Sequence, residues 1–183
     1  FKIIPDSKLK IESLEDRTTY FVAWTTTPWT LPSNTALAVG SEITYVLIET
    51  VNRYNGEIIH IVMAQDLVTK HFKAEGDNKN VEDYEVGEKV LPYKVLDEFD
   101  GKQLNEVRYE QLLSFAQPED GDAFRVVLGD FVTTEDGTGI VHIAPSFGAD
   151  DHNVAKQNGI GSLTLVDRRG RFKPEVQDEL FLY

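Results

Sequence analysis

The stretch WTTTPWTLPSN, residues 24–34, combines three consecutive threonines with two prolines. Each threonine hydroxyl can both donate and accept a hydrogen bond. Pro28 and Pro32 have no N–H group and bias the preceding residues, Thr27 and Leu31, toward extended backbone, which leaves neighbouring amides free for another partner. Such a strip suits the polar atoms of a ligand or an ordered water. An edge strand, with threonine for β-propensity and proline to block aggregation, is the alternative interpretation.

A second group of side chains capable of chemistry lies in GTGIVHIAPSFGADDHN, residues 137–153. An apolar strand carrying His142 comes first, and after Gly148 a helix begins at Asp150 and Asp151. A strand-to-helix junction of this kind gathers an imidazole, the free amides of a helix start and two carboxylates in a small volume. The same residues have structural roles as alternatives, because acids cap helix starts and a histidine can end a core strand with its hydrogen bonds satisfied.

Two other chemistries are disfavoured. A metal site made of His142, Asp150, Asp151 and His152 lacks thiolates and the usual ligand spacings. Ser146 does not occupy a G-x-S-x-G nucleophile elbow, which argues against a serine hydrolase. The chain has no cysteine, so thiolate nucleophiles and disulfides are excluded.

The rest of the pattern must position these two segments. Segments rich in β-branched or aromatic residues and bounded by turn residues predict strands at 18–26, 34–40, 43–50, 57–64, 124–132, 139–145 and 161–167. Their short spacing, without long helical crossovers, favours antiparallel pairing in a barrel or sandwich. Helices are predicted at Ala64–Phe72, Leu104–Phe115 and 148–159. The predicted fold is therefore mainly β with peripheral helices, in the α+β class.

Composition and charge fit one folded domain. The 183 residues, 41% of them hydrophobic, match an ordinary domain. Acidic residues outnumber Lys and Arg by 31 to 18, for a net charge of -13, so the whole surface cannot act as a polycation and any nucleic-acid contact must be local or shared with another domain. The acidic run 74–88 predicts an exposed loop, and RRGR, residues 168–171, predicts a basic hairpin tip. Without a signal peptide or a bilayer-spanning apolar run, we expect a cytoplasmic protein with no membrane contact.

Taken together, the two segments resemble the editing (CP1 insertion) domain of isoleucyl-tRNA synthetase, in the class I aminoacyl-tRNA synthetase family. Valyl and leucyl relatives typically carry an arginine after the paired threonines, where this chain has Thr27. The resemblance covers nearly the whole chain and implies a β-barrel-like editing domain, residues 1–183, excised from a larger synthetase. The H-x-G-H and K-M-S-K-S signatures of the synthetase catalytic core are absent, so aminoacylation by these residues is not expected.

This resemblance implies hydrolysis of the ester bond of mischarged valyl-tRNA, with isoleucyl-tRNA excluded by pocket size. A second site is needed because one methylene changes binding by only about 1–3 kcal/mol, a limit for which this synthetase is itself the usual example. The implied chemistry is direct attack by a positioned water, with no cofactor for editing. The implied partners are the 3′ terminal aminoacyl-adenosine of mischarged tRNA and the remainder of the parent synthetase. We expect the isolated domain to be monomeric.

The resemblance also assigns roles to residues. The expected catalytic residues are Thr26, Thr27, His142 and Asp151. The two threonines hold the water and the developing oxyanion, the Asp151 carboxylate pairs with the α-ammonium group, and the His142 imidazole lies against the amino-acid side chain or ester. The expected substrate-binding residues are Trp24, Thr25, Trp29, Thr30, Asn34 and Asp150. Of these, Trp29 and Thr30 share in excluding isoleucine.

Two other functions stay open. One is an editing domain of a valyl or leucyl synthetase that clears threonine or another small amino acid, and Thr27 in place of arginine argues against it. The other is a noncatalytic β module that only docks tRNA or a protein. It predicts binding without turnover.

Overall fold

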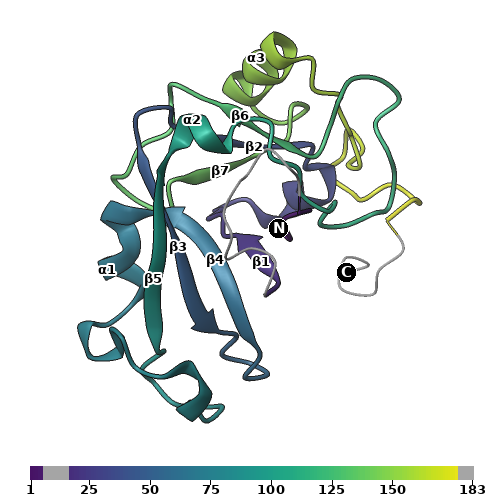
Figure 1. Cartoon of the computed structure of the whole chain (residues 1–183). Helices are drawn as coiled ribbons and strands as arrows, with labels where there is room; N and C mark the ends of the chain where they lie inside the picture. Colours follow the sequence, from purple (N-terminus) through teal and green to yellow (C-terminus); the bar gives the residue numbers. More distant parts are fainter. Residues whose placement is uncertain (6–16, 177–183) are drawn as a thin grey trace.

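The computed structural model describes residues 1–5 and 17–176, which form two open mixed sheets with short helices around them (Figure 1). The larger sheet has the strand order β1-β4-β3-β5 and the smaller has β6-β2-β7. The strands are β1 (Thr19–Phe21), β2 (Ala36–Val39), β3 (Thr44–Val51), β4 (Ile58–Ala64), β5 (Tyr93–Asp100), β6 (Arg125–Leu128) and β7 (Ile140–Ile143). The helices are α1 (Val68–His71), α2 (Gly101–Leu104) and α3 (Ala149–Asn158), with 3-10 helices η2 (Pro28–Ser33), η3 (Gln65–Leu67), η4 (Ala74–Gly76) and η5 (Val81–Asp83). In the described ranges no helix has the length and apolar character needed to cross a membrane.

Strand pairing is mixed, which corrects the prediction of antiparallel pairing throughout. β3 pairs antiparallel with β4 and β5, and β2 pairs antiparallel with β7. However, β1 runs parallel to β4 and β2 runs parallel to β6. In both parallel pairs the two partners are separated in the sequence by other strands. Neither pair is therefore joined directly by a single crossover helix. Among the described residues the sheets stay open, and the β-barrel-like part of the prediction is corrected: the fold is α+β with two sheets.

Most predicted elements are present, and three predictions need correction. The helix predicted at Leu104–Phe115 is wrong, because α2 ends at Leu104 and the next residues run alongside β6, where the Val126 amide donates to the Val107 carbonyl at 2.9 Å. Residues 161–167 form no strand and only one bridge of an antiparallel hairpin, Val166 to Phe172, with the predicted basic tip between them. Strand β5 was not predicted. The acidic run 74–88 is largely exposed, as predicted.

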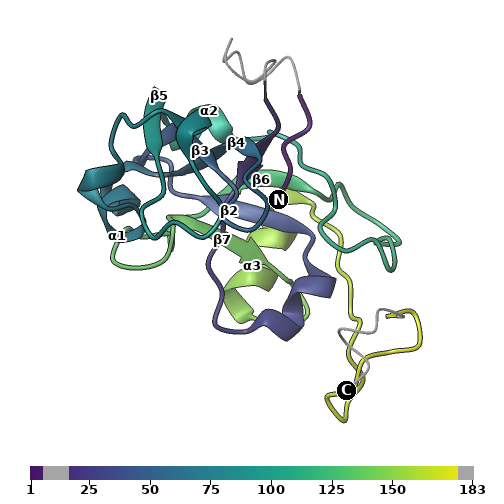
Figure 2. The same ribbon diagram turned by 90° about the horizontal axis from the view of Figure 1, so that it is seen from below.

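Strand β2 is buried on both faces and divides the core in two. Leu37 and Val39 belong to the main cluster, which is built largely from the larger sheet. Ala36 and Ala38 belong to a second cluster that includes Val154 of α3. Figure 2 shows α3 and strands β3, β4 and β5 on opposite sides of the smaller sheet. Because alternate residues of a strand face opposite ways, the large β2 residues fill the main core and the alanines let α3 approach closely.

The two sheets are joined at Tyr45, near the start of β3. Its hydroxyl donates to the Gly139 carbonyl at 2.6 Å and accepts from the Gly40 amide at 3.0 Å. Burial raises the pKa of the Tyr45 phenol to about 12, so it stays a neutral donor. Gly139 has φ +73°, and a Cβ atom there would lie 2.4 Å from the Cβ atom of Ala64. Glycine is therefore required where β7 begins beside the end of β4.

Gly139→Ala should destabilise the chain more than Gly170→Ala, a control with nearly the same backbone conformation. Gly170 has φ +75° but no heavy atom within 4 Å of an added Cβ. Both variants carry left-handed strain of about 1–2 kcal/mol, whereas only Gly139→Ala adds overpacking of about 1–3 kcal/mol. Urea denaturation measures both free energies of unfolding. Equal losses in the two variants would contradict the close contact between Gly139 and Ala64.

Candidate functional site

A pocket of about 440 Å³ opens where η2, the end of β7 and the start of α3 meet. Its lining residues are Trp24, Thr25, Thr26, Thr27, Trp29, Thr30, Val141, His142, Phe147, Gly148 and Asp151. The two segments singled out in the sequence therefore meet at one cavity. The structure brings together eight of the ten predicted site residues, all except Asn34 and Asp150.

The threonines form a closed turn and not an extended ribbon with free amides. The Thr27 amide donates to Thr25 Oγ1 at 3.1 Å, and the two hydroxyl oxygens lie 3.3 Å apart. Thr27 has φ −124° and ψ 64°, which is neither helical nor the extended backbone that was predicted before a proline. Pro28 begins η2, which includes Leu31. Proline suits a first helical position because its missing N–H would have no partner there. Extended backbone was thus wrongly predicted for Leu31. The exposed Thr26 hydroxyl has no hydrogen bond within residues 1–5 and 17–176.

Thr30 and His142 connect the two segments inside the pocket. Thr30 Oγ1 donates to the Thr27 carbonyl at 2.8 Å and lies 3.0 Å from His142 Nε2. Because the hydroxyl proton is directed at a carbonyl, Nε2 must carry the proton of the second bond. His142 Nδ1 is then a bare acceptor, and in the described part of the chain it has no partner. Burial lowers the pKa of His142, with Asp151 opposing the shift, so the imidazole is neutral near pH 7.

Asp151 lies at the junction between β7 and α3. Its Oδ2 atom accepts from the Ala144 amide at 2.9 Å, which fixes the carboxylate. An added Cβ at Gly148 would lie 3.2 Å from Asp151 Oδ1, so glycine leaves room for the carboxylate to turn into the pocket. The helix dipole stabilises its negative charge in the first turn of α3. Oδ1 has no hydrogen bond to another described residue and is available to a ligand.

Asn34 and Asp150 lie outside the pocket lining. Asn34 is only 2% exposed, and its Nδ2 donates to the carbonyls of Ala36 at 2.8 Å and Ile143 at 3.4 Å. Its Oδ1 accepts from the Tyr109 hydroxyl at 2.7 Å. These bonds hold the end of η2 against the end of β7, behind the pocket wall. Asp150 is exposed in the first turn of α3.

Sequence reasoning missed three lining residues, Val141, Phe147 and Gly148. All lie within the segment that was singled out, so proximity to His142 was the signal that could have found them. A further contact was not foreseeable from sequence. Gly137 packs closely against Trp24, since a Cβ atom added at Gly137 would lie 3.2 Å from Trp24 Cβ.

The pocket offers one carboxylate, one neutral imidazole and four threonine hydroxyls, with two tryptophans at its rim. Trp24 and Trp29 are 58% and 53% exposed, which leaves apolar surface for a ligand to cover. A carboxylate beside hydroxyl groups suits a ligand that carries an ammonium group together with polar oxygens. No three His, Asp or Glu side chains among the described residues are grouped so as to hold a metal ion.

The chain is similar to several isoleucine–tRNA ligases, although no family model matches it. It is 53% identical over 167 residues to the enzyme of Bacteroides fragilis, 51% over 181 residues to that of Cytophaga hutchinsonii, and 44% over 170 residues to that of Clostridium acetobutylicum. These alignments cover 91% to 93% of the chain. The chain spans only 14% to 16% of the length of these relatives.

Solved structures with a similar fold come from leucyl-tRNA synthetases. The crystal structure of GlLeuRS-CP1 matches with a TM-score of 0.59 and 18% identity, covering 84% of this chain and 53% of that one. The editing domain of the P. falciparum cytosolic leucyl-tRNA synthetase matches with a TM-score of 0.56 and 15% identity, covering 82% and 52%. At these identities the likeness concerns the fold alone.

His142 should make folding stability fall on the acid side. Because its pKa is lowered in the folded state, the unfolded chain takes up the proton first as pH falls. This contribution to stability is complete above the unfolded pKa, about 6.5, and is lost as pH falls toward the lowered folded value, with a slope of at most about 1.4 kcal/mol per pH unit. His142→Gln cannot titrate there and should flatten the dependence. Urea midpoints of both proteins at about pH 7.5 and about pH 5.5 test this. Parallel pH profiles would contradict it.

Proposed function

The chain belongs to the isoleucine–tRNA ligase family and has the fold of a CP1 editing domain, and from this premise we propose that it hydrolyses the ester bond of mischarged valyl-tRNA and spares isoleucyl-tRNA. The observation that carries the proposal is the convergence of the threonine turn and the Asp151 carboxylate on one pocket. The proposed partners are the 3′ aminoacyl-adenosine of tRNA and the remainder of the synthetase, in the cytoplasm. No cofactor enters the proposed reaction.

Asp151 is the proposed anchor for the α-ammonium group of the valyl ester. Its Oδ2 atom is held by the Ala144 amide, so Oδ1 is presented in a fixed direction. A charge-assisted hydrogen bond between ammonium and carboxylate is roughly twice as strong as a neutral one. An amino acid without this charged group, or with the group in another place, loses that bond. The anchor therefore fixes where the ester carbonyl lies in the pocket.

The threonine turn is the proposed holder of the attacking water and of the developing oxyanion. Thr25 Oγ1 already accepts the Thr27 amide, so the turn is preorganised before substrate arrives. The Thr26 and Thr27 hydroxyls are the groups assigned to water and oxyanion. Water adds its oxygen to the carbonyl carbon, the bond from that carbon to the ribose oxygen breaks, and a water proton ends on the ribose oxygen. The products are valine and tRNA with a free 3′ terminal ribose.

Thr30 and His142 form the proposed wall that excludes isoleucine. Both side chains are more than nine-tenths buried and bonded to each other at 3.0 Å. Moving either one to admit another methylene breaks a buried hydrogen bond, which costs about 1–3 kcal/mol. Steric rejection by such a wall supplies discrimination that attraction to one methylene cannot. Trp29, beside Thr30 in the lining, completes the proposed wall.

A valyl or leucyl editing function is the nearest competitor. Thr27 stands where those enzymes typically carry arginine, and the relatives at 44% to 53% identity are isoleucine–tRNA ligases. A docking module without turnover is the other competitor. Deacylation assays with valyl-tRNA, isoleucyl-tRNA and threonyl-tRNA separate all three functions.

Asp151→Asn should lower the rate of valyl-tRNA deacylation by at least about 100-fold, because the ammonium anchor loses its charge. Asparagine keeps an oxygen for the Ala144 amide, so the junction between β7 and α3 should stay folded. Asp150→Asn makes the same charge change on the neighbouring exposed carboxylate and should keep near-normal turnover. Single-turnover deacylation of labelled valyl-tRNA gives both rates. Equal rates for the two variants would remove Asp151 from the site.

His142→Ala should admit isoleucyl-tRNA by opening the proposed wall. Selectivity for valyl over isoleucyl substrate should fall by about 10-fold or more, the range set by a methylene in an apolar pocket. Parallel deacylation of the two charged tRNAs measures the ratio, and circular dichroism checks the fold. If the ratio of the two rates is unchanged in a folded variant, another residue excludes isoleucine.

A further inference from the structure

We propose that residues 165–173, here called the basic hairpin, bind backbone phosphates of the RNA strand whose 3′ end enters the pocket. The inference rests on the proposed function, because it requires an RNA end at that pocket. It assigns a role to RRGR, which the hydrolytic chemistry does not use.

The basic hairpin has a well-defined turn held by Asp167. The Lys173 amide donates to the Leu165 carbonyl at 3.0 Å, and the Asp167 amide donates to the Arg171 carbonyl at 2.8 Å. Asp167 Oδ1 accepts from the amides of Arg169 and Arg171 at 2.8 and 3.0 Å. Its Oδ2 accepts from the Arg171 guanidinium at 3.0 and 3.1 Å. The carboxylate therefore both shapes the turn and neutralises Arg171.

Arg168 and Arg169 are the two cations that this turn leaves unpaired. Both are exposed, and neither guanidinium has a hydrogen bond or ion pair with another residue of 1–5 and 17–176. They occupy the central positions of the turn that the Gly170 amide closes onto the Asp167 carbonyl at 3.0 Å. The hydrogen bonds of the turn fix its backbone before an anion binds, and the planar guanidinium group matches phosphate oxygens.

The root of the basic hairpin is anchored to both segments that form the pocket. Ser33 Oγ, at the end of η2, accepts from the Leu165 amide at 3.1 Å. Ser146 Oγ, one residue before Phe147 of the lining, donates to the Leu163 carbonyl at 3.0 Å. From Leu165 to Arg169 the chain spans at most about 14 Å. In Figures 1 and 2 the yellow segment that carries the hairpin leaves the body of the molecule beside η2.

Charge complementarity identifies a phosphate backbone as the occupant. Residues 167–173 carry four cations and one acid in a chain of net charge -13. An RNA strand brings one negative charge per nucleotide toward a pocket whose own ionised lining group is the Asp151 carboxylate. Local cations near the pocket offset this repulsion, and the basic hairpin, whose root is bonded to Ser33 of η2, supplies them.

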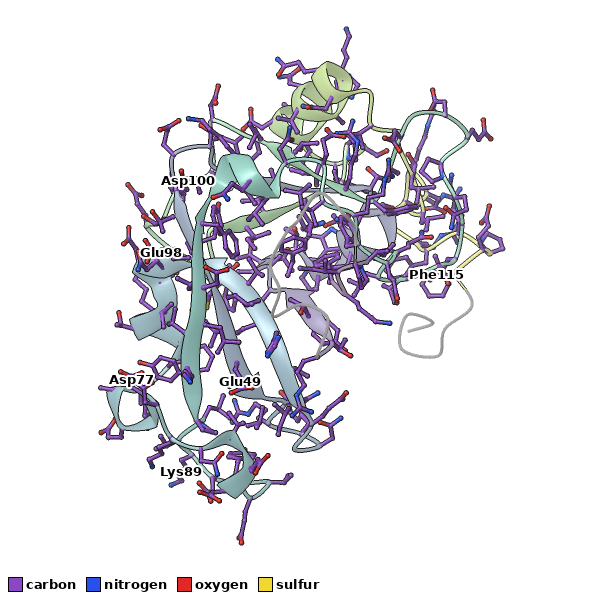
Figure 3. The ribbon with its side chains drawn as sticks, in the orientation of Figure 1. Glu49, Asp77, Lys89, Glu98, Asp100 and Phe115 are labelled. Atoms are coloured by element: carbon purple, nitrogen blue, oxygen red, sulfur yellow. The ribbon has the colours of Figure 1, made fainter. Side chains whose placement is uncertain are left out.

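The test measures how salt changes the binding of an RNA hairpin that has a single-stranded 3′ CCA end and carries no amino acid. Fluorescence anisotropy reports the binding. Three proteins are compared: the unaltered chain, Arg168→Gln/Arg169→Gln, and Lys79→Gln/Lys89→Gln. The lysine pair removes the same two charges from exposed positions, and Figure 3 shows Lys89 at the end of the larger sheet remote from α3. Loss of two phosphate contacts should reduce the slope of log K against log salt by about 1.4. The affinity advantage of the unaltered chain over the arginine variant then shrinks about sevenfold between about 50 and about 200 mM salt.

Hydrolysis of a valyl ester of adenosine, which has no backbone phosphates, provides the second readout. The arginine variant should hydrolyse it at the unaltered rate, whereas its KM for valyl-tRNA rises. If the arginine variant has the same slope of log K against log salt as the unaltered chain, the proposal is overturned. The basic hairpin would then be a candidate contact for a protein partner. If both double variants lose the same RNA affinity, the proposal is also overturned. The loss would then reflect the more negative net charge of the chain, which repels RNA wherever the cations are removed. Because this RNA carries no amino acid, its binding can be measured even if the chain hydrolyses no ester. Failure of the proposed function can therefore be distinguished from failure of the proposed phosphate contacts.

Discussion

Burial of β2 on both faces is the constraint on which the pocket depends. All four of its residues are inaccessible to solvent, with Leu37 and Val39 in the main core and Ala36 and Ala38 against the α3 side. Strand β7, which carries His142, is positioned by its ladder to β2. Helix α3, which carries Asp151, is positioned by packing on the small face of β2. One four-residue strand thus sets the distance between the imidazole and the carboxylate.

Residues of the pocket combine structural and chemical roles, and the two kinds of role use different atoms. One oxygen of Asp151 holds the Ala144 amide while the other is left for a ligand. Similarly, Thr30 satisfies one nitrogen of the buried His142, and the other nitrogen stays without a partner in the described residues. The helix-cap interpretation of the two aspartates is not met in the described residues, because Gly148 is the N-cap of α3 and no side chain caps it. The core-histidine interpretation holds for only one of the two ring nitrogens of His142. A polar group with two binding atoms can stabilise the fold with one and bind substrate with the other.

The sequence brought the threonines, His142 and Asp151 to one site only through the family resemblance of its two segments, because Thr30 and His142 are 112 positions apart and short-range backbone preferences cannot join them. It was insufficient where distant contacts decide. Residues after Leu104 have helical composition, yet Tyr109 is buried at 1% exposure and bonded to Asn34, and tertiary pairing overrides propensity there. The resemblance assigned Asn34 to substrate, and nothing local in the sequence shows that the Ile143 carbonyl would occupy its amide. Strand β5 was missed because its many charged residues do not alternate with apolar ones as a half-buried strand requires.

Three of the four edges of the two sheets, at β1, β6 and β5, are protected in different ways. The outer side of β1 is covered by the first residues of the chain, with the Phe21 amide donating to the Phe1 carbonyl at 2.8 Å. The outer side of β6 is covered by residues 106–109. Strand β5 stays at the edge of its sheet but carries charged side chains, of which Glu98 and Asp100 project from it in Figure 3. Unpaired edges template intermolecular strand addition, and charge on an edge opposes it. The acidic side chains of β5 therefore oppose the edge-to-edge pairing of chains by which fibrils grow.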